Sequence, residues 1–200
     1  MTSRRKALKL FRVNKGYARM QSLKAASIHT SVVRSLMEQG KIEKVKSGLY
    51  RLADLPLDPN QGLIEACLAM PKAVVCLHSA LSYYELSTEM PPSIMIALPR
   101  NAKPKNLLHP PLRVFYFSGT HYQEGIESIS TRGGIIRIYC REKSIMDAFR
   151  FRNRLGLDVA LEALREYMRR YPGDLGKLVN WSKTSRLLSV LRPYLEVFAR

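Results

Sequence analysis

Residues 20–52, MQSLKAASIHTSVVRSLMEQGKIEKVKSGLYRL, decide the fold of the first quarter of the chain. Apolar side chains recur there at three- and four-residue spacings, the period of an amphipathic helix. The pattern breaks at residues 27–29, and Gly40 follows its second part directly, where a left-handed glycine commonly ends a helix. The stretch therefore predicts two short helices joined by a tight turn, with a cap for the second helix among residues 29–31. The apolar stripe consists of Leu23, Ala26, Ile28, Val32, Val33, Leu36 and Met37.

After Gly40 the sequence favours a β-hairpin. Residues 41–45 and 49–52 are joined by Lys46-Ser47-Gly48, a short loop that ends in glycine. Two helices followed by a two-stranded wing make a winged helix-turn-helix, whose second helix can enter the major groove of DNA while the wing contacts the flanking backbone. A small helical hairpin used for protein contact is the alternative.

The expected DNA contacts divide between the second helix and the wing. Small polar groups stand at the start of the helix, and Arg34 lies one turn further along the same face, where an arginine can donate two hydrogen bonds to guanine. Lysines of the wing would neutralise phosphates. The predicted DNA-contacting residues are His29, Thr30, Ser31, Arg34, Lys41, Lys44, Lys46 and Ser47.

The charge of the chain is concentrated near its N-terminus. The 200 residues include 33 Lys and Arg against 16 Asp and Glu, a net charge of +17, with 46% hydrophobic residues as in a globular protein. Residues 1–53 hold 13 basic and 2 acidic side chains, whereas residues 54–200 hold 20 and 14. Such a basic face attracts polyanions, and binding through it should weaken steeply with salt. Anionic membrane is the rival polyanion, but no long basic amphipathic helix with aromatic anchors is evident.

The three cysteines and the apolar segments indicate the compartment. Cys67, Cys76 and Cys140 lack C-x-x-C spacing and are odd in number, which argues against a disulfide framework and a zinc site. We expect buried thiols in a reducing environment. Neither a signal peptide nor a run of roughly 18 apolar residues is present. The sequence therefore predicts a cytoplasmic protein that does not enter the membrane.

The rest of the chain has a different organisation. Two prolines and two aspartates in residues 53–60, ADLPLDPN, indicate a linker. We expect a winged domain at 1–53, a linker at 54–60 and a larger domain at 61–200. Four prolines make 99–111 an irregular loop. Strand-like segments in the middle and helices at the end predict an α+β fold with a small mixed sheet covered by helices and a helical C-terminal end.

The chain is expected to be helical from residue 182 onward. Proline is tolerated at the first position of a helix, so Pro193 is predicted to begin a last short helix.

Three segments, taken in order, resemble the AbiEi family of antitoxins from bacterial abortive-infection (type IV) toxin–antitoxin systems. The resemblance covers nearly the whole chain. The segments are GKIEKVKSGLYRL (40–52), PKAVVCLHSALSYYEL followed by PPSIMIALPR (71–86 and 91–100), and YCREKSIMDAFRFRNRLGLDVALEALREYMRR (139–170).

This resemblance implies a function. Members of the family join a winged helix to a C-terminal antitoxin domain, repress their own operon by binding inverted repeats of double-stranded promoter DNA, and oppose a nucleotidyltransferase-like toxin, directly or indirectly. Residues 25–27 depart from the family, where a glycine often opens the turn. The positions that match a family motif are Glu142, Lys143, Asp147 and Arg152, and a basic patch of the second domain would comprise Arg150, Arg152 and Arg154.

No catalytic, metal or cofactor site is predicted. His78, Ser79 and Asp147 could be imagined as a hydrolase triad, but no G-x-S-x-G turn frames the serine, which should instead cap a helix. The four histidines are scattered without the spacing of metal ligands. We therefore expect a protein that is not an enzyme.

Two other functions remain open from the sequence. The first is a toxin-binding interaction protein with incidental affinity for DNA. The second is an RNA-binding regulator, in which bases would stack on Tyr83, Tyr84, Tyr116 and Tyr122. The oligomeric state is also open, since either a dimer or one copy on each half-site would suit an inverted repeat.

Overall fold

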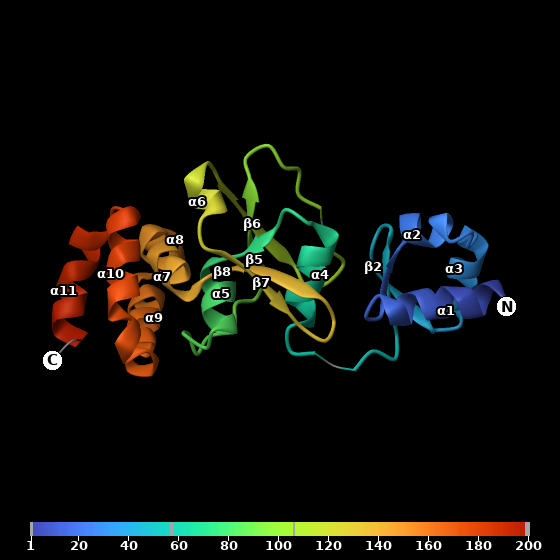
Figure 1. The fold of residues 1–200 in the computed structure, drawn as a ribbon, viewed down its shortest axis with the longest axis horizontal. Coiled ribbons are helices and arrows are strands. Elements are labelled where there is room, and N and C mark those ends of the chain that lie inside the picture. The colour runs from blue at the N-terminus through green and yellow to red at the C-terminus, as the bar shows by residue number, and fades with distance from the viewer. Residues whose placement is uncertain (1, 57, 106, 199–200) are drawn as a thin grey trace. The chain divides into compact units, whose positions relative to one another are not determined.

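The structure is a computed structural model that describes residues 2–56, 58–105 and 107–198 (Figure 1). Leu57 of the predicted linker, Asn106 of the predicted loop and residues 199–200 lie outside the described residues. The chain forms two compact units. Unit 1 comprises residues 1–71, 104–111 and 130–136, and unit 2 comprises residues 72–103, 112–129 and 137–200.

Unit 1 contains the predicted winged helix-turn-helix, and the structure confirms it. Its helices are α1 (Ser3–Val13), α2 (Met20–Ala25), α3 (Thr30–Glu38) and α4 (Gln61–Ala69), and its strands are β1 (Tyr17–Arg19), β2 (Ile42–Lys46) and β3 (Leu49–Leu52). The sheet is antiparallel, in the order β1-β3-β2. The sequence indicated a two-stranded wing and missed β1, because a strand of three residues is too short to show a period.

Local signals fix both ends of α3. His29 is the N-cap, and its Nδ1 accepts a hydrogen bond from the backbone N–H of Ser31. At the other end, Gly40 has φ +64°, and the backbone N–H groups of Gly40 and Lys41 bond to the carbonyls of Met37 and Leu36. This pair of bonds is a Schellman motif, which satisfies carbonyls that the helix end leaves open.

The turn before α3 contains a serine in a left-handed conformation. Ser27 has φ +59°, the left-handed conformation that glycine adopts most easily. The core beneath the turn is formed by Ala7, Phe11, Ala18, Leu23, Ile28, Val33, Leu36, Ile42, Tyr50 and Leu52. Met37 was expected in this core but is 38% exposed, because it lies at the edge of the apolar stripe, beside the wing.

Unit 2 is built on a mixed five-stranded sheet, as the predicted α+β fold requires. The strand order is β6-β5-β4-β8-β7, with β4 antiparallel to β5 and parallel to β8, and β5 parallel to β6. The strands are β4 (Val74–Val75), β5 (Ile94–Pro99), β6 (Leu112–Phe117), β7 (Ile126–Ser130) and β8 (Ile135–Tyr139).

The helices of unit 2 follow in two groups. The shorter ones near the sheet are α5 (Leu77–Tyr83) and α6 (Thr120–Gln123), and the later ones are α7 (Arg141–Arg150), α8 (Arg152–Leu155), α9 (Leu157–Arg170), α10 (Leu175–Thr184) and α11 (Leu188–Phe198), with a 3-10 turn at Pro172–Asp174. Figure 1 shows α9, α10 and α11 side by side at the C-terminal end. Pro193 lies inside α11 and does not begin it, so that prediction is wrong. The chain turns earlier, at Arg186, whose φ is +56°.

Candidate nucleic-acid interface

The outer face of α3 is exposed because its inner face is held in the core. Val33 and Leu36 are buried, and Ile28 packs in the same cluster from the preceding turn. Arg4 of α1 donates a hydrogen bond to the Ser35 hydroxyl (3.1 Å), which ties the first helix to the third. Helix α3 is therefore fixed by apolar packing and presents Thr30, Ser31 and Arg34 to solvent.

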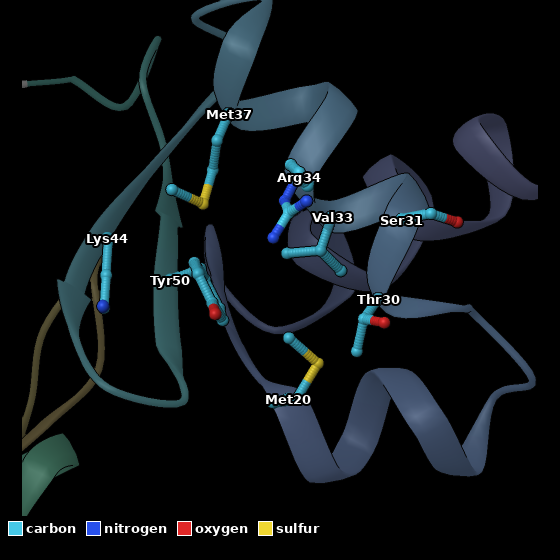
Figure 2. A pocket seen from close by; sticks show the side chains of 8 residues that line it. All are labelled: Met20, Thr30, Ser31, Val33, Arg34, Met37, Lys44 and Tyr50. Carbon is cyan, nitrogen blue, oxygen red and sulfur yellow. The ribbon is translucent and has the colours of Figure 1, made fainter.

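A cavity of about 390 Å³ lies between α3 and the sheet of the wing (Figure 2). Four of the predicted DNA-contacting residues line it, three from α3 and Lys44 from β2. Figure 2 shows the guanidinium of Arg34 directed toward the space between Met37 and Tyr50. The described lining residues are Met20, Thr30, Ser31, Val33, Arg34, Met37, Lys44 and Tyr50.

The cavity combines two kinds of surface. Arg34 and Lys44 supply charge, and Thr30 and Ser31 supply hydroxyl groups. The other lining side chains are Val33 and Met37, which the sequence assigned to the apolar stripe, and Met20 and Tyr50, which it did not assign to the site. Their positions at the margin of the core, where the helix meets the strands, are a tertiary feature with no local signal. Such a mixture suits the edges of bases in the major groove. Guanine can accept hydrogen bonds from an arginine, and the methyl group of thymine can pack against apolar side chains.

The remaining four predicted residues lie outside the lining of this cavity. His29 is engaged as the cap of α3, and its Nδ1 is 2.9 Å from the Ser31 hydroxyl oxygen. Lys41 follows the helix end, and its carbonyl accepts from the backbone N–H of Ala53. The ammonium of Lys46 donates to the carbonyl of Ser47 (3.0 Å).

Lys46 lies in a crowded cationic environment. Desolvation lowers its pKa from the ordinary value, and the nearby charges of Lys105 and Arg19 lower it further. An anion placed between cations that repel one another stabilises their charged forms. The wing is thus suited to phosphate, although the structure places its lysines apart from the cavity, except for Lys44.

The predicted basic patch of the second domain is only partly available. Arg150 donates to the carbonyl of Ser185 and Arg152 to the carbonyl of Phe149, each at 2.7 Å. Arg154 is exposed on α8. Two of the three guanidinium groups therefore hold the backbone of their own unit.

The other residues that the resemblance singled out, Glu142, Lys143 and Asp147, are buried in α7. Lys143 and Asp147 are 3% and 1% exposed, and the ammonium lies 2.6 Å from a carboxylate oxygen. Asp147 also bonds His121 (2.9 Å), while Glu142 accepts from the Tyr167 hydroxyl (2.7 Å). These residues tie helices and loops of unit 2 together.

The three side chains considered as a hydrolase triad each bond to other residues and not to one another. The Nε2 atom of His78 lies 3.1 Å from the Ser87 hydroxyl oxygen, and Asp147 faces Lys143 and His121. The hydroxyl of Ser79 accepts from the backbone N–H of Met95 (2.8 Å). Ser79 lies within α5 and does not cap it, so the expected cap is wrong. Among the described residues, no group of three potential ligands could hold a metal ion.

The tyrosines proposed for base stacking are not equivalent. Tyr84 donates to Glu127 and packs edge-on against Tyr83, and Tyr122 donates to the carbonyl of Lys72. Tyr116 is 48% exposed on β6. The cysteines are all free and buried, as expected.

Comparison with known proteins identifies the segment that carries α1, α2, α3 and the wing. Residues 5–53 match the family model described as a transcriptional regulator, AbiEi antitoxin. The winged domain is therefore similar to the AbiEi family over these residues. The cavity lined by Arg34 and Lys44 lies within the matched residues. No curated protein matches the chain. In the described part of the chain, no helix is both long enough and apolar enough to cross a membrane.

Proposed function

We propose that the protein is the antitoxin of a bacterial type IV toxin–antitoxin system and represses its own operon. Residues 1–53 bind inverted repeats in the promoter, residues 54–60 act as a linker, and residues 61–200 oppose a nucleotidyltransferase-like toxin in the cytoplasm. The match of residues 5–53 to the AbiEi regulators supports the first role. The resemblance of the later segments supports the second.

The cavity beside α3 is the observation that carries the DNA-binding role. It gathers a guanidinium, two hydroxyls and an ammonium on one exposed face of a winged helix. Residues 1–53 also carry 13 basic and 2 acidic side chains, the electrostatic footprint of a nucleic-acid-binding domain. Arg34 then reads a base, and Lys44 contacts the backbone.

A test should separate promoter binding from protection against the toxin. Deleting residues 1–53 is too disruptive, because buried Glu65 accepts hydrogen bonds from the Tyr17 hydroxyl and from Arg51 (both 3.2 Å). Losing these donors leaves a buried carboxylate less well paired. The double variant Arg34→Ala/Lys44→Ala changes only exposed side chains and leaves the core intact.

The double variant should lose promoter repression in a reporter strain and still rescue growth when the toxin is co-expressed. Lys183→Ala, an exposed cation of α10, is the matched control and should retain both activities. If the double variant folds but fails to protect against the toxin, this face of α3 binds the toxin, and the protein is an interaction protein whose DNA affinity is incidental.

A further inference from the structure

Unit 2 contains a cavity of about 500 Å³ that the proposed DNA-binding role does not use. Its cationic lining residues are Lys72, Arg100 and Arg137, and its aromatic ones are Phe117 and Tyr122. Among the described residues that line it there is no Asp or Glu.

The sheet topology brings these distant residues together. Strands β5 and β6 are parallel with Pro99 opposite Phe117, so the chain leaves both strands at one edge of the sheet, and Arg100 follows there. Strand β4 runs antiparallel to β5 with Val74 opposite Ala97, which places Lys72 at the level of Pro99. The edge where adjacent parallel strands end is a common place for ligands in open sheets.

Arg137 completes the cationic set from the next strand. It lies in β8, which is parallel to β4 with Ile138 opposite Val75. Three cations from three separate segments therefore surround one hollow. Such an arrangement attracts a multiply charged anion, and arginine binds phosphate oxygens with two donors at once. A volume of this size lies within the range of small-molecule sites.

The aromatic wall of the cavity is rigidly supported. The Phe117 ring packs on His121 and stacks on Tyr139, with centroids 4.2 Å and 5.9 Å away. Behind it, the Lys143 ammonium lies 5.3 Å from the centroid of Phe117 and is paired with Asp147. Asp147 also bonds His121, so the buried ion pair fixes one neighbour of the ring.

Tyr122 is also held in place. The Tyr122 hydroxyl of α6 donates to the carbonyl of Lys72, which joins α6 to the segment before β4. Phe117 is only 3% exposed, so the half-buried ring of Tyr122 is the aromatic surface against which a nucleobase can pack. A phosphate group and a planar base thus each find matching chemistry within one cavity.

We propose that this cavity binds a mononucleotide, with its phosphates on Lys72, Arg100 and Arg137 and its base against Tyr122. The site is built from unit 2 alone and does not depend on DNA binding by the winged domain. A free nucleotide and a nucleic-acid strand both carry phosphate esters, so either could bind these cations. The test must therefore distinguish these two sources.

The experiment titrates the full chain with a fluorescently labelled adenosine triphosphate and then adds unlabelled competitors. We expect saturable binding that is displaced by adenosine triphosphate, less well by pyrophosphate, and least by adenosine. Lys72→Gln and Arg100→Gln should each weaken binding by about tenfold, because each removes a charge-assisted contact. Lys183→Gln should change it by less than about twofold, and Arg34→Ala should leave it unchanged.

Several results would overturn the proposal. One is the absence of saturable binding, and another is equal affinity for wild type and both cavity variants, with folding verified by circular dichroism. If adenosine displaced the label as well as the triphosphate does, the cations would not contribute to binding. If pyrophosphate displaced it equally well, the base would not contribute. A single-stranded hexanucleotide that competes far better at equal phosphate concentration would make this a nucleic-acid surface.

Discussion

Arg34 of α3 and Lys44 of β2 line the same cavity, although one belongs to a helix and the other to a strand. The Schellman motif at Gly40 reverses the chain between them, so that β2 returns beside the helix. A side chain suited to guanine thus stands beside a side chain suited to phosphate. Their different chemistry leads to different expectations for their removal.

Arg34→Ala should reduce discrimination between promoter and random DNA. Removing a bidentate contact to guanine costs about 1–3 kcal/mol at one base pair and little elsewhere. Fluorescence anisotropy on a set of promoter fragments, each changed at a single base pair, would reveal one position at which the variant no longer distinguishes the bases. An equal loss on every fragment would show that Arg34 contacts only the backbone.

Lys44→Ala should weaken binding to all DNA fragments to a similar degree. A lost phosphate contact lowers the slope of log affinity against log salt by about one, because one fewer counterion is released. Titrations at several salt concentrations measure this slope directly. The control Lys183→Ala should keep the wild-type slope, and a Lys44→Ala variant that also keeps it would contradict a phosphate contact.

Gly40→Ala should destabilise the protein by about 1 kcal/mol. An added Cβ at Gly40 would meet no atom within 4 Å, so the cost arises from its φ of +64°. Gly176→Ala is the matched control. It lies in α10, where an added Cβ also meets nothing, and should stabilise by about 0.5–1 kcal/mol. Urea unfolding measures both changes, and a shift of the same sign in the two variants would refute the explanation.

Asp147→Asn should destabilise unit 2 strongly. Breaking a buried ion pair at one partner typically costs about 3–5 kcal/mol, because the other charge stays buried. Burial lowers the pKa of Lys143, and the charge of Asp147 opposes that effect. Glu196→Gln, in the exposed pair with Arg192, should cause little change. If thermal unfolding shows the two variants to be equally stable, the buried pair is not an important contact.

Glu162 should contribute to the acid sensitivity of folding. Partial burial raises its pKa, but hydrogen bonds from Thr88 and Ser87 lower it more, so the pKa lies below the ordinary value. A carboxyl with a lowered folded-state pKa stabilises above its unfolded pKa of about 4.3, and this stability is lost as the pH falls through the folded value. The stability difference between wild type and Glu162→Gln should therefore shrink as the pH falls from about 6 to 3. A difference that stays constant would contradict this role.

The features that sequence predicted well are local. The cap at His29, the left-handed Gly40 and the apolar spacing between them mark α3 within a single short stretch. The features it missed depend on tertiary contacts. Met37 follows the helical period but lies beside the wing. The Ser79 hydroxyl accepts from the backbone N–H of Met95, 16 residues further along the chain, a contact that no local pattern indicates. The pairing of Lys143 with His121 through Asp147 likewise appears only when α6 packs against α7.

The proposed function requires that the exposed face of α3 reads the promoter of the protein's own operon. Its most direct test compares the affinity of the purified wild-type protein for the upstream promoter fragment and for a scrambled duplex of equal length and composition, at physiological ionic strength. We predict a clear preference for the promoter fragment, which Arg34→Ala reduces. Equal affinity for the two duplexes would contradict promoter recognition by α3.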